Sequence, residues 1–247
     1  MNKEHRVVQI IVCYNDANQI TELNRTVVFD EGSIRLTYLD NRNRSFPSAA
    51  AAYNYALKSS DKSVDVIIFC HQDIRFSDKS IWLISEACLN EKNTLFGVAG
   101  VRNEGNKNWG KTISTLNGTR TNWPPDEEEK YTTVFTLDEC LIAGHRSVFE
   151  KVTFDEKICD GWHLYATDLC LQCHLAGIEV KVLDAQVQHL SPGHVDKAFI
   201  KTEGKLAKKY QKNFEIISHT NGWTYTNPVK RGLLLGYRWL KYRWWKM

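Results

Sequence analysis

One short segment, residues 64–76, constrains the fold of this chain more than any other: VDVIIFCHQDIRF. Its run of β-branched and aromatic residues is too short for an ordinary helix and ends abruptly in polar residues, which is typical of a strand buried on both faces of a parallel sheet. Ligands of open α/β sheets bind beyond the carboxyl ends of the strands. We therefore expect His71, Gln72 and Asp73 to lie at a binding crevice. A carboxylate and an imidazole in that position can bind a divalent metal, and the metal can in turn bind a diphosphate.

Strands and helices alternate through the first 101 residues. The apolar patterns predict strands at 7–13, 34–39, 64–70 and 95–101, and helices at 18–28, 47–57 and 78–89. Ser45 or Ser48 can cap the second helix, and Asp78 can cap the third. This alternation predicts an α/β fold with a parallel, doubly wound sheet and right-handed crossovers.

The alternation stops after residue 101. Residues 102–130 form a long polar loop that contains Trp109 and Trp123, and tryptophans in such a loop favour a lid over disorder. Beyond it we expect strands at 132–137, 180–183 and 186–190, and helices at 148–152, 165–176 and 195–210. The chain thus divides into one domain over 1–194, with halves 1–101 and 102–194, and a helical extension over 195–247.

The positive charge of the chain is concentrated in its tail. Residues 230–247 contain six lysines and arginines and no acid, so the remainder carries −3 although the whole chain carries +3. A net charge this small does not indicate a nucleic-acid partner. We expect no signal peptide, no membrane-spanning helix and, from the seven cysteines, a reducing cytoplasm.

Four motifs together resemble the family 2 glycosyltransferases, which have the GT-A fold. They are Val12-Cys13-Tyr14-Asn15, Tyr38-Leu39-Asp40-Asn41, Phe69-Cys70-His71-Gln72-Asp73, and a long block that includes residues 154–171 and 182–191. The third motif is similar to that of a bacterial subset with His-Gln-Asp in place of Asp-x-Asp. The resemblance covers roughly residues 7–193, and it implies inverting transfer of a sugar from a nucleotide-sugar donor to a hydroxyl group.

The resemblance also implies where the donor and a metal would bind. Tyr14, Asn15 and Asp40 would hold the nucleotide, although Asp40-Asn41 read alone is equally a turn. His71, Gln72 and Asp73 would lie at the donor, with Mn²⁺ or Mg²⁺ bound by Asp73 and His189. His71 remains open at this point as a ligand, a phosphate donor or a strand-end cap, and His189 read alone is a packed histidine.

The catalytic base implied by the resemblance is Asp168. Read alone, an acid in the first turn of a helix stabilises that helix, so both interpretations stand. Trp162 and His163 would border the acceptor, with a buried aromatic residue and a satisfied histidine as the alternative reading. Trp109 would reach the acceptor from the loop that closes over the donor.

Two further features of the sequence suggest binding. Cys170 and Cys173 have the spacing of half a zinc site, but they lie within a predicted helix without a second pair, so we interpret them as core thiols. In the tail, Leu233, Tyr237, Leu240 and Trp244 recur at helical spacing among the cations. This pattern favours a segment that lies on a membrane surface over a helix docked on the body.

These observations predict a metal-dependent inverting glycosyltransferase at the cytoplasmic, inner face of a bacterial membrane. Its acceptor would be a glycan or a lipid-linked precursor of a surface polysaccharide or glycolipid. Two alternatives remain: a nucleotidyl-type enzyme, which the absence of a Gly-rich loop after the first strand disfavours, and a non-catalytic protein that binds nucleotide-sugars or glycans with the same fold.

Overall fold

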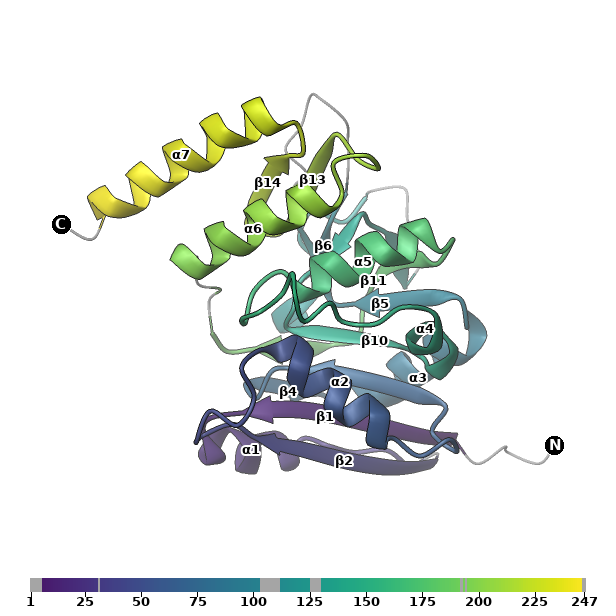
Figure 1. Cartoon of the computed structure of the whole chain (residues 1–247). Helices are drawn as coiled ribbons and strands as arrows, with labels where there is room; N and C mark the ends of the chain where they lie inside the picture. Colours follow the sequence, from purple (N-terminus) through teal and green to yellow (C-terminus); the bar gives the residue numbers. More distant parts are fainter. Residues whose placement is uncertain are drawn as a thin grey trace.

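A seven-stranded sheet with the order β2-β1-β3-β10-β5-β11-β8 forms the centre of the computed structural model, which describes residues 6–30, 32–102, 112–124, 130–191, 193 and 195–245 (Figure 1). Five of its strands are parallel: β1 (Arg6–Tyr14), β2 (Gly32–Asp40), β3 (Val66–Cys70), β5 (Thr94–Gly97) and β11 (Glu179–Leu183). Two strands run the other way, β10 (Leu141–His145) and β8 (Tyr131–Thr133). The predicted α/β fold with a mostly parallel sheet is confirmed.

Helices cover both faces of this sheet. They are α1 (Ala17–Asn24), α2 (Ala49–Ser59), α3 (Ser80–Asn90), α4 (Arg146–Lys151) and α5 (Tyr165–Leu175). Successive side chains of a strand point to opposite faces. Accordingly Phe69 belongs to one core cluster with Tyr53 of α2, and Ile68 belongs to another with Ile81 of α3. Every residue of β3 is buried, which explains its uninterrupted apolar run.

The expected single strands at 95–101 and 132–137 are both wrong, because each divides between two sheets. Residues 94–97 form β5, whereas β6 (Ala99–Val101) pairs with β7 (Thr112–Ser114) and β9 (Thr136–Leu137). The break falls at Val98, whose carbonyl oxygen accepts from the Thr115 N–H at 3.0 Å. That contact takes the Val98 carbonyl out of the central sheet and turns the chain away.

One strand of the central sheet was not predicted from the sequence. β10, which the sequence patterns did not predict, is inserted antiparallel between β3 and β5. Its short segment LIAGH lacks a distinctive period of its own and gains its strand geometry from two neighbours that supply hydrogen-bond partners.

The structure confirms a predicted helix cap for α2 but not for α3. Of the two predicted caps, Ser48 and not Ser45 caps α2, by accepting from the Ala51 N–H at 3.1 Å. Asp78 does not cap α3, which begins at Ser80. Instead, the Ser80 hydroxyl accepts from the Ser77 N–H at 2.8 Å, so a serine inside the helix satisfies the preceding turn.

The C-terminal part packs on the second half of the domain. It contains α6 (Lys197–Lys209), the hairpin of β13 (Ile216–His219) and β14 (Gly222–Tyr225), and α7 (Pro228–Trp245), which packs alongside α6 (Figure 1). Arg238 of α7 contacts the buried carboxylate of Glu203 on α6. Within the described part of the chain, the helices are too short or too polar to cross a lipid bilayer.

Candidate metal and nucleotide site

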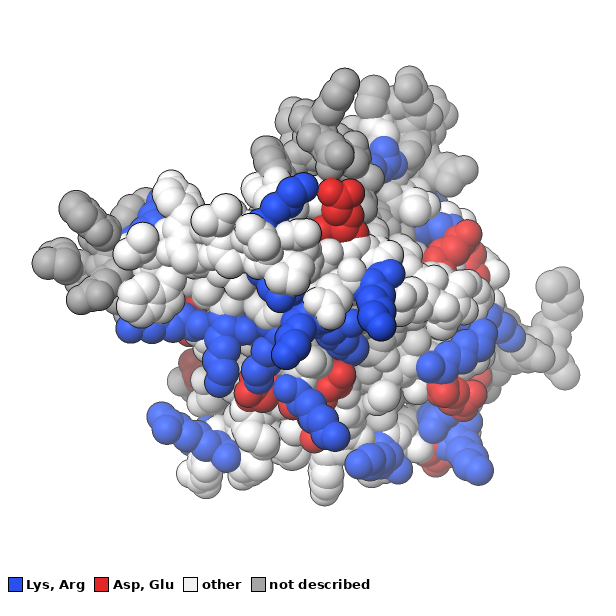
Figure 2. All heavy atoms as spheres, turned by 45° about the horizontal axis from the view of Figure 1, so that its top comes forward, with Lys and Arg blue, Asp and Glu red and all other residues white. Residues whose placement is uncertain are grey.

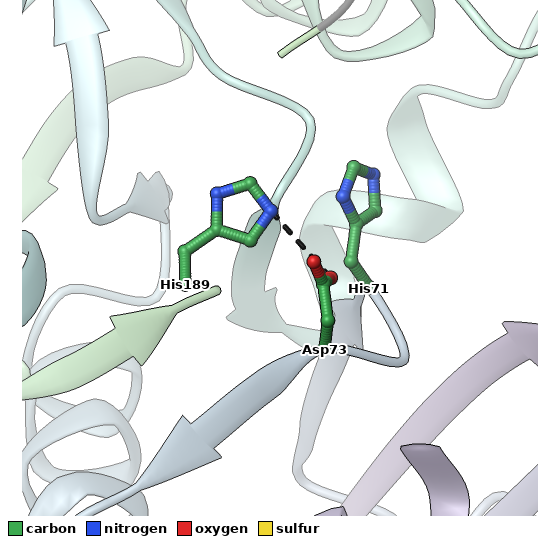
Figure 3. A group of neighbouring side chains, drawn as sticks. All are labelled: His71, Asp73 and His189. Carbon is green, nitrogen blue, oxygen red and sulfur yellow. Dashed lines mark ion pairs between the residues drawn. The ribbon is translucent and has the colours of Figure 1, made fainter. Parts of the chain in front are cut away.

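A two-stranded sheet brings the tip of β3 and a distant segment together. β4 (Ile74–Phe76) follows β3 after a tight turn, and β12 (Val187–His189) pairs antiparallel with it, placing His189 opposite Ile74. His189 Nε2 thereby lies 3.5 Å from Asp73 Oδ1, and His71 faces both residues (Figure 3). One potential ligand atom from each of the three residues lies within 4.8 Å of the others.

Backbone contacts fix the side chains of this cluster. The Ser191 N–H donates to Asp73 Oδ2 at 3.1 Å, and the Leu190 N–H donates to the Asp73 carbonyl at 3.3 Å. The backbone N–H of His189 donates to Asn117 Oδ1 of the short 3₁₀ helix Leu116–Gly118 at 3.2 Å. These contacts hold His189 against Asn117, and hold Leu190 and Ser191 against Asp73.

The electrostatics of the cluster keep the carboxylate charged. Burial opposes ionisation of Asp73, but the contacts with His189 and Ser191 and the charge of His189 outweigh it and hold the pKa of Asp73 well below its usual range. Burial lowers the pKa of His71, which favours the neutral imidazole. For His189, burial is outweighed by Asp73, and the pKa is raised.

The three residues fit a divalent cation. His189 Nε2 is buried and lies 3.5 Å from Asp73 Oδ1 without a hydrogen bond that would occupy it, so this nitrogen is available to a metal ion. A carboxylate and two imidazoles form a donor set suited to Mn²⁺-type ions. Among the described residues, His71, Asp73 and His189 form the group of potential ligands that lie close enough together to hold one metal ion.

A cavity of about 1050 Å³ opens above the cluster. Of the predicted donor and acceptor residues, it brings together Tyr14, Asn15, His71, Gln72, Asp73 and Trp162. The wall also includes residues that the sequence analysis did not select, namely Cys13, Asp16, Gln19, Asn41, Arg42, Arg44, Phe46, Pro47, Tyr53, Tyr165 and Ser191. Its volume is in the range of ligand-binding cavities.

Gln72 shapes this cavity, because its amide is occupied within the protein. Its Oε1 accepts from the backbone N–H groups of Asn15 and Asp16, both at 3.0 Å, and its Nε2 donates to Asn15 Oδ1 at 2.8 Å. These bonds join the tips of β1 and β3. Gln72 thus positions Asn15 in the cavity wall.

Asp40 lies beside the wall of the cavity, already paired. Arg42 contacts both of its carboxylate oxygens, at 2.6 Å from Nη2 to Oδ2 and 3.0 Å from Nε to Oδ1. Arg42 and Arg44 themselves line the cavity, and Arg44 has a left-handed backbone conformation with φ of 56°. Two cations directly after a strand tip are the sequence signal that could have identified this basic wall.

The structure does not bring Asp168 to the cavity, so the predicted base lacks the required geometry. Asp168 is 0% exposed. Its Oδ1 lies 2.6 Å from Lys209 Nζ and 2.9 Å from the Tyr210 hydroxyl, and its Oδ2 accepts from Gln172 Nε2 at 2.7 Å. Because α6 covers this face of α5, an acceptor hydroxyl cannot reach the carboxylate. The buried ion pair indicates a structural role.

Other described residues singled out in the sequence do not line the cavity. His163 Nε2 lies 3.2 Å from Asp196 Oδ1, outside the cavity wall, so it does not border an acceptor there. Trp109 lies outside the described residues. Cys170 and Cys173 are buried free thiols, which agrees with their interpretation as core residues.

Comparison with known proteins identifies the family. A family model described as "Glycosyltransferase like family" matches residues 9–218, which is most of the chain. The chain belongs to this glycosyltransferase-like family. A curated relative from Fuscovulum blasticum, called "ATP synthase subunits region ORF 6", is 27% identical over 159 residues, which are 60% of each protein.

Solved structures of other proteins share the GT-A fold of this chain. GalNAc-T7, crystallised with UDP, GalNAc and Mn²⁺, has a TM-score of 0.65 at 8% identity, over 86% of this chain and 49% of its own. Staphylococcus aureus TarS 1–349 has a TM-score of 0.55 at 14% identity, over 85% of this chain and 67% of its own. The chain thus spans about half to two thirds of these proteins.

We predict that Asp168→Asn mainly lowers stability. The substitution removes the buried negative charge that pairs with Lys209, although Lys209 keeps its second partner Asp155 at 2.9 Å. We expect a loss of about 1–3 kcal/mol of unfolding free energy. Urea unfolding measures it. The matched control is Asp160→Asn, which removes the more exposed ion pair with Lys205 of the same helix and should cost less than about 1 kcal/mol. Equal losses in the two variants would contradict the structural role.

Proposed function

We propose that this protein is a divalent-metal-dependent glycosyltransferase that transfers a sugar from a nucleotide-sugar donor to a hydroxyl group. The observation that carries the proposal is the cluster of His71, Asp73 and His189 beside a cavity of about 1050 Å³ in a member of a glycosyltransferase-like family. His71, Asp73 and His189 would hold Mn²⁺ or Mg²⁺. When bound, the cation would offset the negative charge that develops on the departing diphosphate.

The donor class is supported by the ligands of the solved structures with this fold. GalNAc-T7 was crystallised with UDP, and TarS 1–349 was crystallised in complex with UDP-GlcNAc. In this chain, Tyr14 and Asn15 lie at the tip of β1 and the guanidinium groups of Arg42 and Arg44 line the same cavity. Guanidinium groups bind phosphate oxygens by charge-assisted hydrogen bonds, so we assign this wall to the nucleotide diphosphate.

We infer that transfer proceeds by a single displacement. The acceptor oxygen forms a bond to the anomeric carbon while the bond to the diphosphate oxygen breaks, and the acceptor proton leaves to a base. A covalent glycosyl intermediate needs a free carboxylate, but the two acids in the described wall are engaged: Asp16 caps α1 and Asp73 lies against His189. A single displacement inverts the anomeric centre. The exposed Trp162 in the wall offers an aromatic face to an acceptor sugar.

We further propose that α7 lies on an anionic membrane and so holds the enzyme near a lipid-linked acceptor. Leu233, Tyr237 and Leu240 are 73%, 64% and 55% exposed on one side of the helix, while Arg238 anchors the other side. Figure 2 shows Lys and Arg side chains gathered along this part of the molecule, where α6 presents exposed lysines such as Lys201 and Lys208. Apolar residues flanked by cations suit an anionic lipid surface.

We propose that the enzyme acts at the cytoplasmic, inner face of a bacterial membrane, in the synthesis of a surface polysaccharide or glycolipid. The alternative is a non-catalytic protein that binds nucleotide-sugars with the same fold. The pocket would serve either function, so donor turnover distinguishes them.

We predict that the full-length protein releases nucleoside diphosphate from one member of a panel of UDP- and GDP-sugars when Mn²⁺ is present, and that EDTA abolishes the release. Asp73→Asn should lower the rate at least about 100-fold, because it removes a charged ligand of the cation. Asp61→Asn, an exposed acid paired with Arg35, is the control and should keep the wild-type rate. Turnover that is insensitive to EDTA and to Asp73→Asn would contradict metal dependence.

We predict that Arg44→Ala weakens binding of the donor's nucleoside diphosphate about 10-fold or more, since it removes a charge-assisted contact worth roughly 1.5–3 kcal/mol. Isothermal titration with UDP and GDP measures this affinity. Arg35→Ala removes an arginine that pairs with Asp61 outside the cavity wall and serves as the matched control. If both variants bind equally tightly, Arg44 does not contact the diphosphate.

We predict that the wild-type protein co-sediments with vesicles containing phosphatidylglycerol and that binding weakens as salt is raised. The double variant Leu233→Ser, Leu240→Ser should lose most of this binding because it removes apolar anchors. Leu175→Ser, a leucine of α5 that is also 55% exposed, is the control. Equal sedimentation of the three proteins, or binding to phosphatidylcholine vesicles alone, would argue against docking by α7.

A further inference from the structure

Tyr165 connects the metal cluster to the backbone of the domain. Its hydroxyl lies 3.0 Å from His71 Nε2 and 3.2 Å from the carbonyl oxygen of Glu139. Its ring is buried at the first position of α5 and packs against Tyr53 and Phe154, with centroids at 5.6 Å and 6.1 Å. The packing leaves the hydroxyl little freedom to move away from His71.

The hydrogen-bond chemistry at this hydroxyl assigns the proton on His71. A carbonyl oxygen can only accept, so the single proton of Tyr165 goes to Glu139. The Tyr165 oxygen then accepts from His71, and the His71 Nε2 therefore carries a hydrogen. The Tyr53 hydroxyl is an alternative acceptor for the Tyr165 proton. A proton directed at Tyr53 instead of Glu139 likewise leaves the Tyr165 oxygen to accept from His71.

The other ring nitrogen of His71 is then left with a free lone pair. Figure 3 shows one nitrogen of the His71 ring on the side of Asp73 and His189 and the other directed away from them. Because Nε2 contacts Tyr165, the nitrogen on the side of the cluster is Nδ1. In the neutral imidazole, a proton on Nε2 makes Nδ1 the acceptor. The opposite tautomer would direct an N–H group at a cation.

We propose that Tyr165 is a positioning residue that sets the tautomer of His71 and thereby makes His71 Nδ1 a third metal ligand beside Asp73 and His189. This inference rests on the metal site of the proposed function. It identifies Nδ1 as the His71 atom that would face the cation. Histidine ligands commonly donate their second N–H to an oxygen that orients the ring, and Tyr165 supplies that oxygen here.

The tautomer can be measured without a metal. Two-dimensional ¹H–¹⁵N correlation spectra of the imidazole groups in the metal-free, full-length protein should show His71 neutral with its proton on Nε2. The signal is assigned by its loss in His71→Gln. A His71 that carries its proton on Nδ1 would overturn the proposal, whatever the enzyme's activity.

The second measurement is Mn²⁺ affinity, by calorimetry and by electron paramagnetic resonance of the bound ion. Tyr165→Phe keeps the packed ring and should weaken Mn²⁺ binding about 10–100-fold, as expected for loss of an orienting partner. Tyr210→Phe is the matched control, since it removes an equally buried hydroxyl that contacts Asp168; its Mn²⁺ affinity should equal that of the wild type. Melting temperatures establish that both variants are folded.

The outcomes separate this inference from the proposed function. Equal Mn²⁺ affinity in wild-type and Tyr165→Phe protein would overturn the role of Tyr165 and leave metal-dependent transfer intact. Mn²⁺ binding that depends on Tyr165, in a protein that turns over no donor, would support the inference and overturn the proposed activity. A wild-type protein that binds no Mn²⁺ would overturn both.

Discussion

The candidate site depends on the pairing of β12 with β4. β4 continues from the tip of β3, and its antiparallel register places His189 opposite Ile74. The same pairing lets the Ser191 N–H reach the Asp73 carboxylate at 3.1 Å. Without it, Asp73 and His189, more than a hundred residues apart, would have no reason to meet. The cluster is therefore a property of backbone hydrogen bonds, which hold its side chains at a set distance.

Two acids that look alike in the sequence have opposite environments in the structure. Asp73 remains charged at the edge of a cavity, where a hydrogen-bond donor and a histidine stabilise it. Asp168 is enclosed by Lys209, Tyr210 and Gln172. A buried carboxylate with a complete set of partners contributes to one specific packing of α5 on α6, whereas a carboxylate beside two imidazoles at a cavity edge is suited to a cation.

The C-terminal part of the chain orients α7 on the domain. Glu203 is fully buried on α6 and is shared by Arg238 of α7 and by His219 of β13, whose Nε2 lies 2.9 Å away. This pairing fixes which side of α7 faces the protein. The apolar residues Leu233 and Leu240 are consequently left on the outer side of the helix. The buried carboxylate of Glu203 thus contributes to the orientation of the proposed membrane-facing side, together with the bonds from Arg238 to the Trp223 carbonyl and from Arg231 to the Thr226 carbonyl.

The sequence by itself determined the features that depend on local pattern. The apolar run before His71 specified a strand buried on both faces, Ser45 or Ser48 marked a helix start, and the polar residues after β1 and β3 specified where a crevice would lie. Cys170 and Cys173 could be interpreted as core thiols because a helix carried them. Each of these follows from side-chain periodicity or from hydrogen bonds between residues close in the chain.

Only the tertiary structure decided which distant groups meet. It inserted β10 into the sheet, covered Asp168 with Lys209, and placed the Tyr165 hydroxyl on His71. Such contacts join segments whose own sequences are compatible with several partners, so burial and charge neutralisation across the whole fold select among them. The type of residue shows what chemistry is available, and the packing decides which of these groups reach the cavity.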